Sequence, residues 1–266
     1  MKKLEEKDFD RILNYLREHK TECIYLTIDL EKYGTKSPQV DFWYNETDGE
    51  PDTVLMKYYD SFQIFSANPN WNVEEAAEWI AQYEVTTICG KESMIRALSE
   101  KLSDYTPAYG VVVKQDTFRE FRQFENIRSA LPEDAMEIAR LMCLDEEFDE
   151  NYKLEVLAEQ LADRMKEGVG RSYVMREDGR IVAHVSVFAE NSDMAVVSGL
   201  IVAPEYAGKF YGMIIYEYVK MQLMQEGKTV YGFRIKDSMK RCAKAENGAV
   251  CGGYGKLTRR NKENER

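Results

Sequence analysis

The feature that most constrains this chain is an apolar run that stops at a proline and leads through a glycine-containing turn into a long helical pattern. The apolar residues 195–202 predict a strand, and Ala203-Pro204 ends it, because proline cannot donate to a β-ladder. Gly208 and Gly212 allow the backbone to come close to a bulky group. The first amides of the following helix have no intrahelical partner and lie at the positive end of the helix dipole. The segment therefore predicts an anion site between a strand and a helix.

The turn also has a family resemblance. Residues 200–212 read Leu-Ile-Val-Ala-Pro-Glu-Tyr-Ala-Gly-Lys-Phe-Tyr-Gly. They resemble the acyl-CoA pyrophosphate loop of the GNAT superfamily of N-acetyltransferases, which reads roughly Val-x-Pro-x-Tyr-Arg-Gly-Lys-Gly-x-Gly. Ala207 replaces the usual Arg or Gln, and Phe210 replaces the central Gly. On the loop alone, a strand–turn–helix without a ligand is an equal alternative.

Flanking segments extend the resemblance to about residues 126–255. Residues 127–139 resemble the start of a GNAT domain, where a first strand passes through Pro-Glu-Asp into a helix. Pro132 suits the first turn of that helix, and the acids after it suit the helix dipole. Asp237 stands where the family often has Asn, and Gly248 stands where its next helix ends.

Composition limits the class of protein. The chain has 266 residues, of which 44% are hydrophobic and 31% charged, as in folded globular proteins. A formal net charge of −11 argues against nucleic-acid binding and favours a cationic acceptor such as a small amine. No apolar run is long enough to span a membrane, and the N-terminus is too polar for a signal peptide. Five cysteines without a Cys-x-x-Cys pair predict reduced thiols, a cytoplasmic location and no metal site.

The pattern along the chain predicts an α/β protein with two domains. We expect a divergent α/β domain at 1–120, which has a faint resemblance to a degenerate GNAT copy, and a GNAT-like acyl-CoA-binding domain at 121–266. Its mixed, mostly antiparallel sheet should be flanked by helices. In the second half we expect strands at 126–130, 171–176, 180–190, 194–202, 229–235 and 249–255, and helices at 133–143, 153–167, 207–226 and 238–246. In the first half we expect strands at 22–29, 40–44, 53–58, 61–66, 85–89 and 108–114, and helices at 7–19, 73–83 and 91–102.

The resemblance implies the residues that bind acetyl-CoA. In the family, the backbone of the strand before the loop aligns the pantetheine arm, and loop amides hold the pyrophosphate. A lysine in the loop adds a point charge. The corresponding residues here are Leu200, Val202, Ala207, Gly208, Lys209, Phe210, Tyr211, Gly212 and Asp237.

The sequence does not single out a general base or a general acid. Glu190, Asp193 and Ser198 lie on or near the strands that flank the usual acceptor site, where a carboxylate could take the amine proton through water. His184 could be a base, although a buried structural histidine is the favoured alternative. The family's general acid is a Tyr four residues before Gly248, where this chain has Lys244, so Tyr254 or Tyr211 would have to replace it. The candidate catalytic residues are therefore Glu190, Ser198 and Tyr254.

Together these features predict an acyl-CoA-dependent N-acyltransferase that transfers acetyl from acetyl-CoA to a small amine by direct attack, with a homodimer as one possible assembly. The alternative is a catalytically degenerate GNAT-fold protein that acts as an acyl-CoA-binding or regulatory module, because several usual family positions are altered. The structural feature that bears most on the choice is a β-bulge that would separate two parallel strands near Val202.

Overall fold

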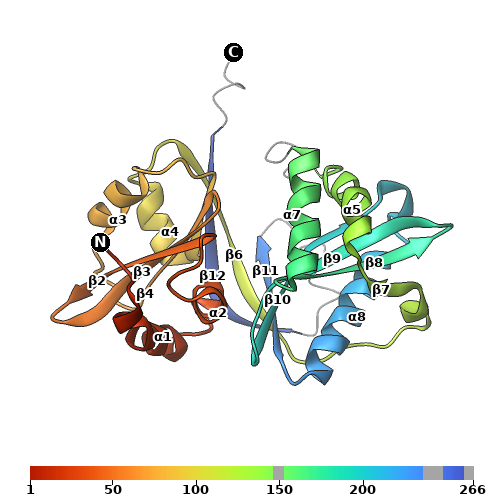
Figure 1. Cartoon of the computed structure of the whole chain (residues 1–266), viewed down its shortest axis with the longest axis horizontal. Coiled ribbons are helices and arrows are strands. Elements are labelled where there is room, and N and C mark those ends of the chain that lie inside the picture. The colour runs from red at the N-terminus through yellow and green to blue at the C-terminus, as the bar shows by residue number, and fades with distance from the viewer. Residues whose placement is uncertain (146–152, 236–247, 261–266) are drawn as a thin grey trace, which may run out of the picture. The chain divides into compact units, whose positions relative to one another are not determined.

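The computed structural model describes residues 1–145, 153–235 and 248–260. Within them the chain divides into two compact units. Unit 1 contains residues 1–112, 233–235 and 250–260, and unit 2 contains residues 113–232 and 248–249. Figure 1 labels the helices and strands of both.

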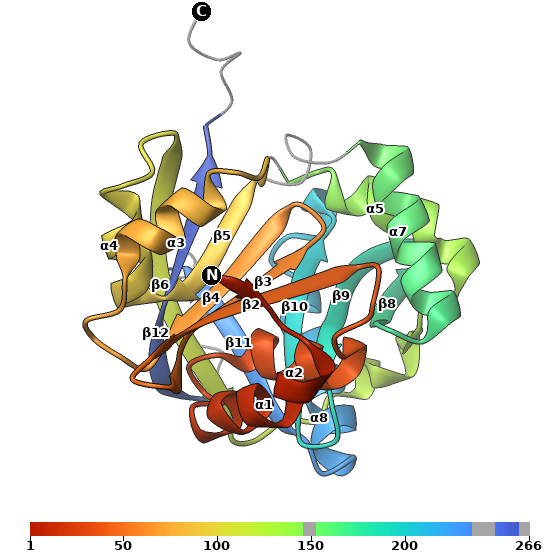
Figure 2. The ribbon, with the colours of Figure 1, turned by 60° about the vertical axis from the view of Figure 1, so that its left-hand side comes forward.

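Unit 1 is a mixed sheet with helices on both faces. Its strands follow the order β1-β2-β3-β4-β5-β12-β6, in which β4 and β5 are parallel. Helices α1 and α2 pack on one face, and α3 and α4 pack on the other (Figure 2). The elements are β1 (Lys2–Lys3), α1 (Phe9–Glu18), α2 (Ile24–Tyr33), β2 (Val40–Thr47), β3 (Glu50–Tyr58), β4 (Ser61–Ser66), α3 (Val73–Ile80), β5 (Thr87–Lys91), α4 (Glu92–Ser99), β6 (Tyr105–Gln115) and β12 (Gly248–Arg259).

Unit 2 has the strand order β11-β10-β9-β8-β7, with β10 and β11 parallel and the other pairs antiparallel. Helices α5 and α7 cover one face of this sheet, and α8 covers the other (Figure 1). The elements are β7 (Ile127–Ser129), α5 (Ala135–Met142), α7 (Leu154–Glu167), β8 (Arg171–Glu177), β9 (Arg180–Glu190), β10 (Met194–Val202), α8 (Tyr211–Gln225) and β11 (Thr229–Ile235).

The two units repeat one order of elements. In each, two helices precede three antiparallel strands, a further helix follows, and the next strand runs parallel to the third. This arrangement confirms the predicted fold class, a mixed and mostly antiparallel sheet flanked by helices.

One predicted strand of unit 1 is wrong. The sequence predicts an extended segment at 22–29, because Ile-Tyr-Leu-Thr-Ile is rich in β-branched and aromatic side chains. These residues instead begin α2 (Ile24–Tyr33), whose residues 24 and 26–30 are all buried. A helix that is buried on most of its circumference has no amphipathic period, so packing overrides the local propensity for a strand.

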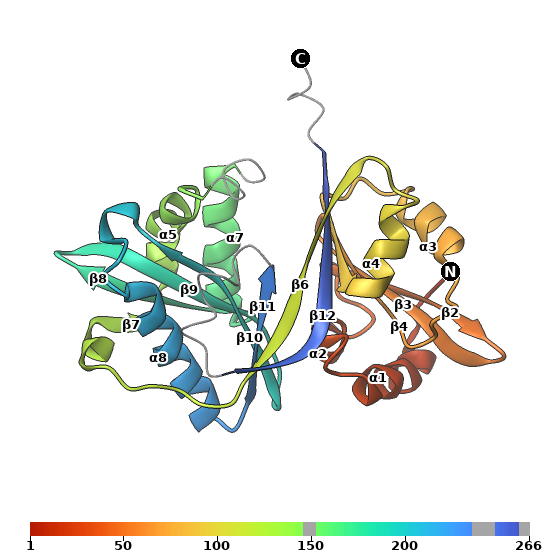
Figure 3. The ribbon, with the colours of Figure 1, turned by 180° about the vertical axis from the view of Figure 1, so that it is seen from behind.

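The last strand pairs differently from the expected one. The sequence predicts a strand at 249–255 within the second half, but β12 runs from Gly248 to Arg259. It pairs with β5 of unit 1, from Tyr254 opposite Lys91 to Thr258 opposite Thr87, and lies beside β6 (Figure 3). The pairing partner is more than 160 residues away in the sequence, which local patterns cannot reveal. The helix predicted at 238–246 lies outside the described residues.

A buried carboxylate ties the start of unit 2 together and gives a testable pH dependence. Asp134 is 4% exposed, and its Oδ2 and Oδ1 lie 2.7 Å and 2.9 Å from guanidinium nitrogens of Arg128 and Arg176. Burial alone would raise the pKa of Asp134, but hydrogen bonds from Arg128, the Leu131 amide and Arg176 lower it from 3.8 to about 2. A carboxyl whose pKa is lower in the folded state stabilises it above the unfolded pKa.

We expect Asp134→Asn to lower the free energy of unfolding by about 2 kcal/mol at neutral pH. The difference from the parent should shrink as the pH falls from 3.8 toward 2, because the parent's carboxyl then becomes protonated as well. Urea denaturation over a pH series measures this. Glu133→Gln changes the exposed neighbouring carboxylate and serves as the control. A difference that stays constant with pH would show that the charge of Asp134 is not what stabilises the fold.

Candidate functional site

The most distinctive backbone feature of unit 2 is a bulge in β10. Ser198 pairs with Ser186 and Ile201 pairs with His184, so two residues of β10 stand opposite one residue of β9. The extra residue falls at Gly199-Leu200, and Gly199 has φ +61°, the left-handed conformation of a glycine bulge. A glycine inside a strand pattern is a sequence signal for a bulge, and Gly199 was nevertheless not among the residues predicted to matter.

Beyond this point the parallel strands part. The pairing of β10 with β11 runs from Met194 opposite Thr229 to Val196 opposite Tyr231, although both strands continue. The Ala203 amide donates to the Val182 carbonyl of β9 at 2.9 Å. Because successive amides of a strand point to opposite edges, the Val202 amide points away from β9, toward the edge that β11 has left. This is the backbone edge that the sequence assigned to the pantetheine arm.

The loop after β10 offers some, but not all, of its amides to a ligand. The Ala207 amide donates to the Pro204 carbonyl at 3.0 Å, and the Lys209 amide donates to the Tyr206 carbonyl at 3.2 Å, so both are used inside the loop. Helix α8 begins at Tyr211, and its first three amides have no intrahelical acceptor. The backbone donors without a backbone partner among the described residues are those of Gly208, Phe210, Tyr211, Gly212 and Met213.

Gly212 serves packing as well as ligand approach. A Cβ at this position would lie 3.1 Å from Cγ2 of Val202 and within 4 Å of two Leu200 methyl carbons. The first turn of α8 therefore lies directly against the end of β10, so a ligand of the loop would also lie beside that strand.

The loop side chains surround a single cation. The Lys209 ammonium lies 4.5 Å from the centroid of the Tyr206 ring and 3.8 Å from a carboxylate oxygen of Glu177. The Tyr211 hydroxyl donates to Glu177, which raises the pKa of Tyr211 to about 12. Glu177 thus tethers the loop from the end of β8, a role that its turn position in the sequence gave no reason to expect. It also occupies the Tyr211 hydroxyl, one of the two candidate general acids.

Phe210 is the loop residue with the most unusual conformation. Its φ is +62°, in the left-handed region that side chains other than glycine rarely adopt, and the residue is 69% exposed. The ring is therefore not part of the core of unit 2, and its position at the N-cap of α8 requires a backbone shape that glycine adopts without strain.

We expect Phe210→Gly to raise the free energy of unfolding by up to about 1 kcal/mol, because it relieves the left-handed strain and removes little buried surface. CoA binding should tighten or stay unchanged. Thermal unfolding and calorimetric titration measure the two effects. Phe210→Ala is the matched control, since it removes the ring but keeps the strained backbone. A clear loss of stability in both variants would show instead that the ring supports the loop.

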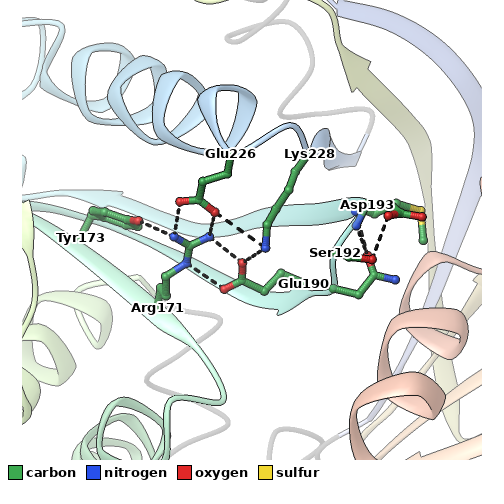
Figure 4. Close-up of polar contacts among 9 residues, drawn as sticks. Arg171, Tyr173, Glu190, Ser192, Asp193, Glu226 and Lys228 are labelled. Atoms are coloured by element: carbon green, nitrogen blue, oxygen red, sulfur yellow. Dashed lines mark hydrogen bonds and ion pairs between the residues drawn. The ribbon is translucent and has the colours of Figure 1, made fainter.

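Glu190 lies at the other end of the strand from the loop. It pairs with Ala195 near the start of β10, whereas Val202 precedes the loop, and seven residues of strand span roughly 23 Å. Burial alone would raise the pKa of Glu190, but Arg171 and Lys228 donate to the carboxylate and lower it. Figure 4 shows this carboxylate between the two cations, with Glu226 bound to the same arginine. Its place in this ion-pair network leaves Glu190 outside the chemistry proposed below. Asp193 lies in the adjoining turn.

Ser198 is beside the bulge, at the point where the parallel strands part. Its hydroxyl oxygen is buried and has no hydrogen-bond partner in the part of the chain that the structure describes. Ser198 faces Ser186 across the ladder, so the two side chains lie on the same face of the sheet, the face covered by α5 and α7. Among the three predicted catalytic residues, Ser198 is the one that the structure brings close to the bulge.

His184 is fully buried. Burial lowers the pKa of His184 to about 4, and a backbone hydrogen bond with Gly199 offsets part of that change. Its Nε2 lies 3.2 Å from the Ser172 hydroxyl and 3.1 Å from the Ser186 hydroxyl. The imidazole is therefore neutral at neutral pH, which agrees with the structural alternative that the sequence favoured over a free base.

The remaining predicted residues lie elsewhere. Tyr254 belongs to unit 1, where its hydroxyl donates to the sulfur of Cys89 at 3.0 Å, and its catalytic role stays a prediction. Asp237 lies outside the described residues. Among the residues that the structure describes, no group of three or more His, Cys, Asp and Glu side chains is placed to bind a metal ion. Nor does any described helix combine the length and the apolar character that a membrane span needs.

Comparison with protein families agrees with this geometry. Residues 133–238 match the model of the acetyltransferase (GNAT) family. The resemblance predicted from the loop is therefore confirmed for the segment that contains β10 and α8. No curated protein sequence matches the chain at a significant level.

Solved structures extend the similarity to the whole chain. A Drosophila protein has a TM-score of 0.68 at 12% identity, with 97% of this chain and 98% of that chain covered. A GCN5-related N-acetyltransferase-like protein from Streptococcus suis has a TM-score of 0.62 at 15% identity, with 96% and 99% covered. A tandem GNAT protein from the clavulanic acid biosynthesis pathway has a TM-score of 0.59 at 12% identity, with 97% of each chain covered. At these identities the similarity shows the fold, and it includes unit 1 as well as unit 2.

Proposed function

We propose that this protein is an acyl-CoA-dependent N-acyltransferase that transfers acetyl from acetyl-CoA to a small amine. The observation that carries the proposal is the combination, on one strand, of the Gly199-Leu200 bulge, the parted β11 and the loop with unpaired amides. The parted edge suits an extended pantetheine arm, and the loop amides suit a pyrophosphate. The family match at residues 133–238 supports the same class of reaction.

Each part of the site then has a role in binding. The amides of Gly208 and of residues 210–213 would donate to the pyrophosphate, and Lys209 would add a positive charge beside it. The Val202 amide and carbonyl would hydrogen-bond the pantetheine arm. Because Ala207 and Lys209 use their own amides inside the loop, they would contribute through position or charge and not through the backbone.

The reaction needs no covalent enzyme intermediate. The amine nitrogen bonds to the acetyl carbonyl carbon, the carbon–sulfur bond breaks, the nitrogen loses a proton to water, and the CoA thiolate takes up a proton. Negative charge develops on the carbonyl oxygen, and a buried hydroxyl can stabilise it as a hydrogen-bond donor. Ser198 is the side chain that we assign to this role, because its hydroxyl is buried beside the bulge without a partner among the described residues.

A second function has its own support. The described groups around the bulge include no carboxylate free to act as a base, since Glu190 is in the ion-pair network and Glu177 is bound to the loop. A protein that binds acyl-CoA as a regulatory or carrier module would need only the loop and the bulge. The acidic composition favours a cationic amine as acceptor in the first case, and a cytoplasmic location follows in both from the reduced cysteines expected.

Two measurements separate these functions. Thermal unfolding with and without acetyl-CoA tests binding, and a free-thiol assay over a panel of small amines tests transfer. The enzyme should be stabilised by acetyl-CoA and release thiol with at least one amine. Stabilisation without thiol release would favour the binding module, and the absence of both effects would contradict the assignment of the loop.

A further inference from the structure

A row of polar side chains runs beneath the β10 bulge, on a face that is otherwise apolar. Ser172, Ser186 and Ser198 lie side by side on three adjacent strands, because Ser172 pairs with Ser186 and Ser186 pairs with Ser198. His184 lies two residues before Ser186 and so shares the same face. The neighbours on this face are side chains of the α5–α7 cluster, such as Val174 and Ile201. Polar groups this deeply buried are normally retained for a specific hydrogen-bonding role.

The contacts of the imidazole assign its protons. The hydrogen bond with the Gly199 backbone raises the pKa of His184, so it favours the protonated nitrogen. The imidazole must therefore be the donor and the Gly199 carbonyl the acceptor, because an amide donor would have the opposite effect. Nε2 is occupied by the two serine hydroxyls, which leaves Nδ1 to donate. Nδ1 makes no other hydrogen bond among the described residues.

A complete set of donors and acceptors follows. Ser172 and Ser186 lie 3.2 Å apart, so one hydroxyl can donate to the other and the second can donate to Nε2. With Nε2 as an acceptor and Nδ1–H as a donor, a neutral ring satisfies every partner without a buried charge. The two serines fix the orientation of the ring, and the ring reaches from β9 to the bulged residue of β10.

We propose that His184 is a positioning residue that holds the Gly199 bulge open through a hydrogen bond from Nδ1–H to the Gly199 carbonyl. This inference rests on the proposed transferase function for its kinetic consequence and on the geometry alone for its structural one. The left-handed Gly199 and the parted β11 depend on the bulge, and the Ser198 hydroxyl lies directly before it. His184 therefore acts on the reacting carbonyl through the backbone and through Ser198, without touching substrate.

Two variants of His184 separate this role from simple packing. Asn retains an N–H close to the position of Nδ1, whereas Leu fills the space without a donor. We expect His184→Leu to lower kcat about tenfold or more, the effect of losing one buried hydrogen bond, with the Kd for CoA within about twofold. His184→Asn should restore most of the activity. Equal activity of the Leu variant and the parent, or equal loss in two folded variants, would overturn the proposal.

The parent protein provides a test that needs neither activity nor a stable variant. Nitrogen-15 NMR of histidine-labelled protein reports the protonation of each ring nitrogen. The proposal requires a neutral ring with the proton on Nδ1 at neutral pH, and a proton on Nε2 or a charged ring would overturn it. If the parent binds acetyl-CoA but transfers to no amine, the proposed function fails while this result still decides the role of His184.

Discussion

Replacement of Gly208 by Asp should weaken CoA binding by between about 10-fold and 100-fold. A carboxylate some 6 Å from a phosphate charge costs roughly 2–3 kcal/mol at an effective dielectric constant of about 20. Gly208 lies in the exposed loop between two engaged amides, with φ +84° and no atom within 4 Å of the place that a Cβ would take. The new side chain therefore has space but brings its charge to the anion site. Calorimetric titration with CoA measures the loss.

Gly208→Asn is the matched control for this prediction. Asn and Asp have similar size, and both tolerate a positive φ better than other side chains do, so they share any backbone strain. We expect the Asn variant to bind CoA within about threefold of the parent, and the gap between the variants to narrow at high salt as the charge is screened. If the Asp variant binds as well as the parent, the pyrophosphate does not bind at this loop.

Replacement of Gly110 by Ala should destabilise unit 1 by about 3 kcal/mol or more. A Cβ on Gly110 would lie 1.9 Å from the carbonyl oxygen of Arg234 and 2.8 Å from Cα of Ile235. Both are backbone atoms, which cannot move aside as a flexible side chain can. Either the strand must shift or β6 must lose its pairing at this point. Urea denaturation monitored by tryptophan fluorescence reports the change, because all three tryptophans of the chain are in the N-terminal 112 residues.

Gly252→Ala serves as the comparison. It also adds one methyl group to a strand of unit 1, but the nearest atom, a Val112 methyl carbon, lies at an ordinary 3.9 Å. Its effect should stay within about 0.5 kcal/mol of zero, as for most substitutions away from special features. Equal stabilities of the two variants would mean that β6 and residues 234–235 are farther apart than the structure has them.

The sequence predicted unit 2 better than unit 1, for physical reasons. Strands 180–190 and 194–202 were predicted with the bounds observed, because their alternation and their turns are local signals. The buried α2 was predicted as a strand, since a helix that is enclosed on most sides carries no amphipathic period. The partner of β12 was not predicted, because pairing over such a distance leaves no local trace.

The site shows the same division. The loop and the strand before it could be located, because Pro204, Gly208 and Gly212 impose backbone constraints that are visible in the sequence. The place of Glu190 could not, since its distance from the loop depends on the register of a hairpin. Glu177 was missed for a related reason. A carboxylate at a turn is usually solvated, and only the folded chain brings it to Tyr211.

The position of β12 has a consequence for how the chain folds during synthesis. Residues 254–258 fill the place between β5 and β6, so the sheet of unit 1 lacks an inner strand until those residues leave the ribosome. At typical elongation rates that delay is on the order of ten seconds after residue 112 is made. During this time β5 and β6 expose unpaired edges, which invite association with other chains. Residues 113–232 can meanwhile complete most of unit 2, so the first half of the chain to be synthesised is the last to be finished.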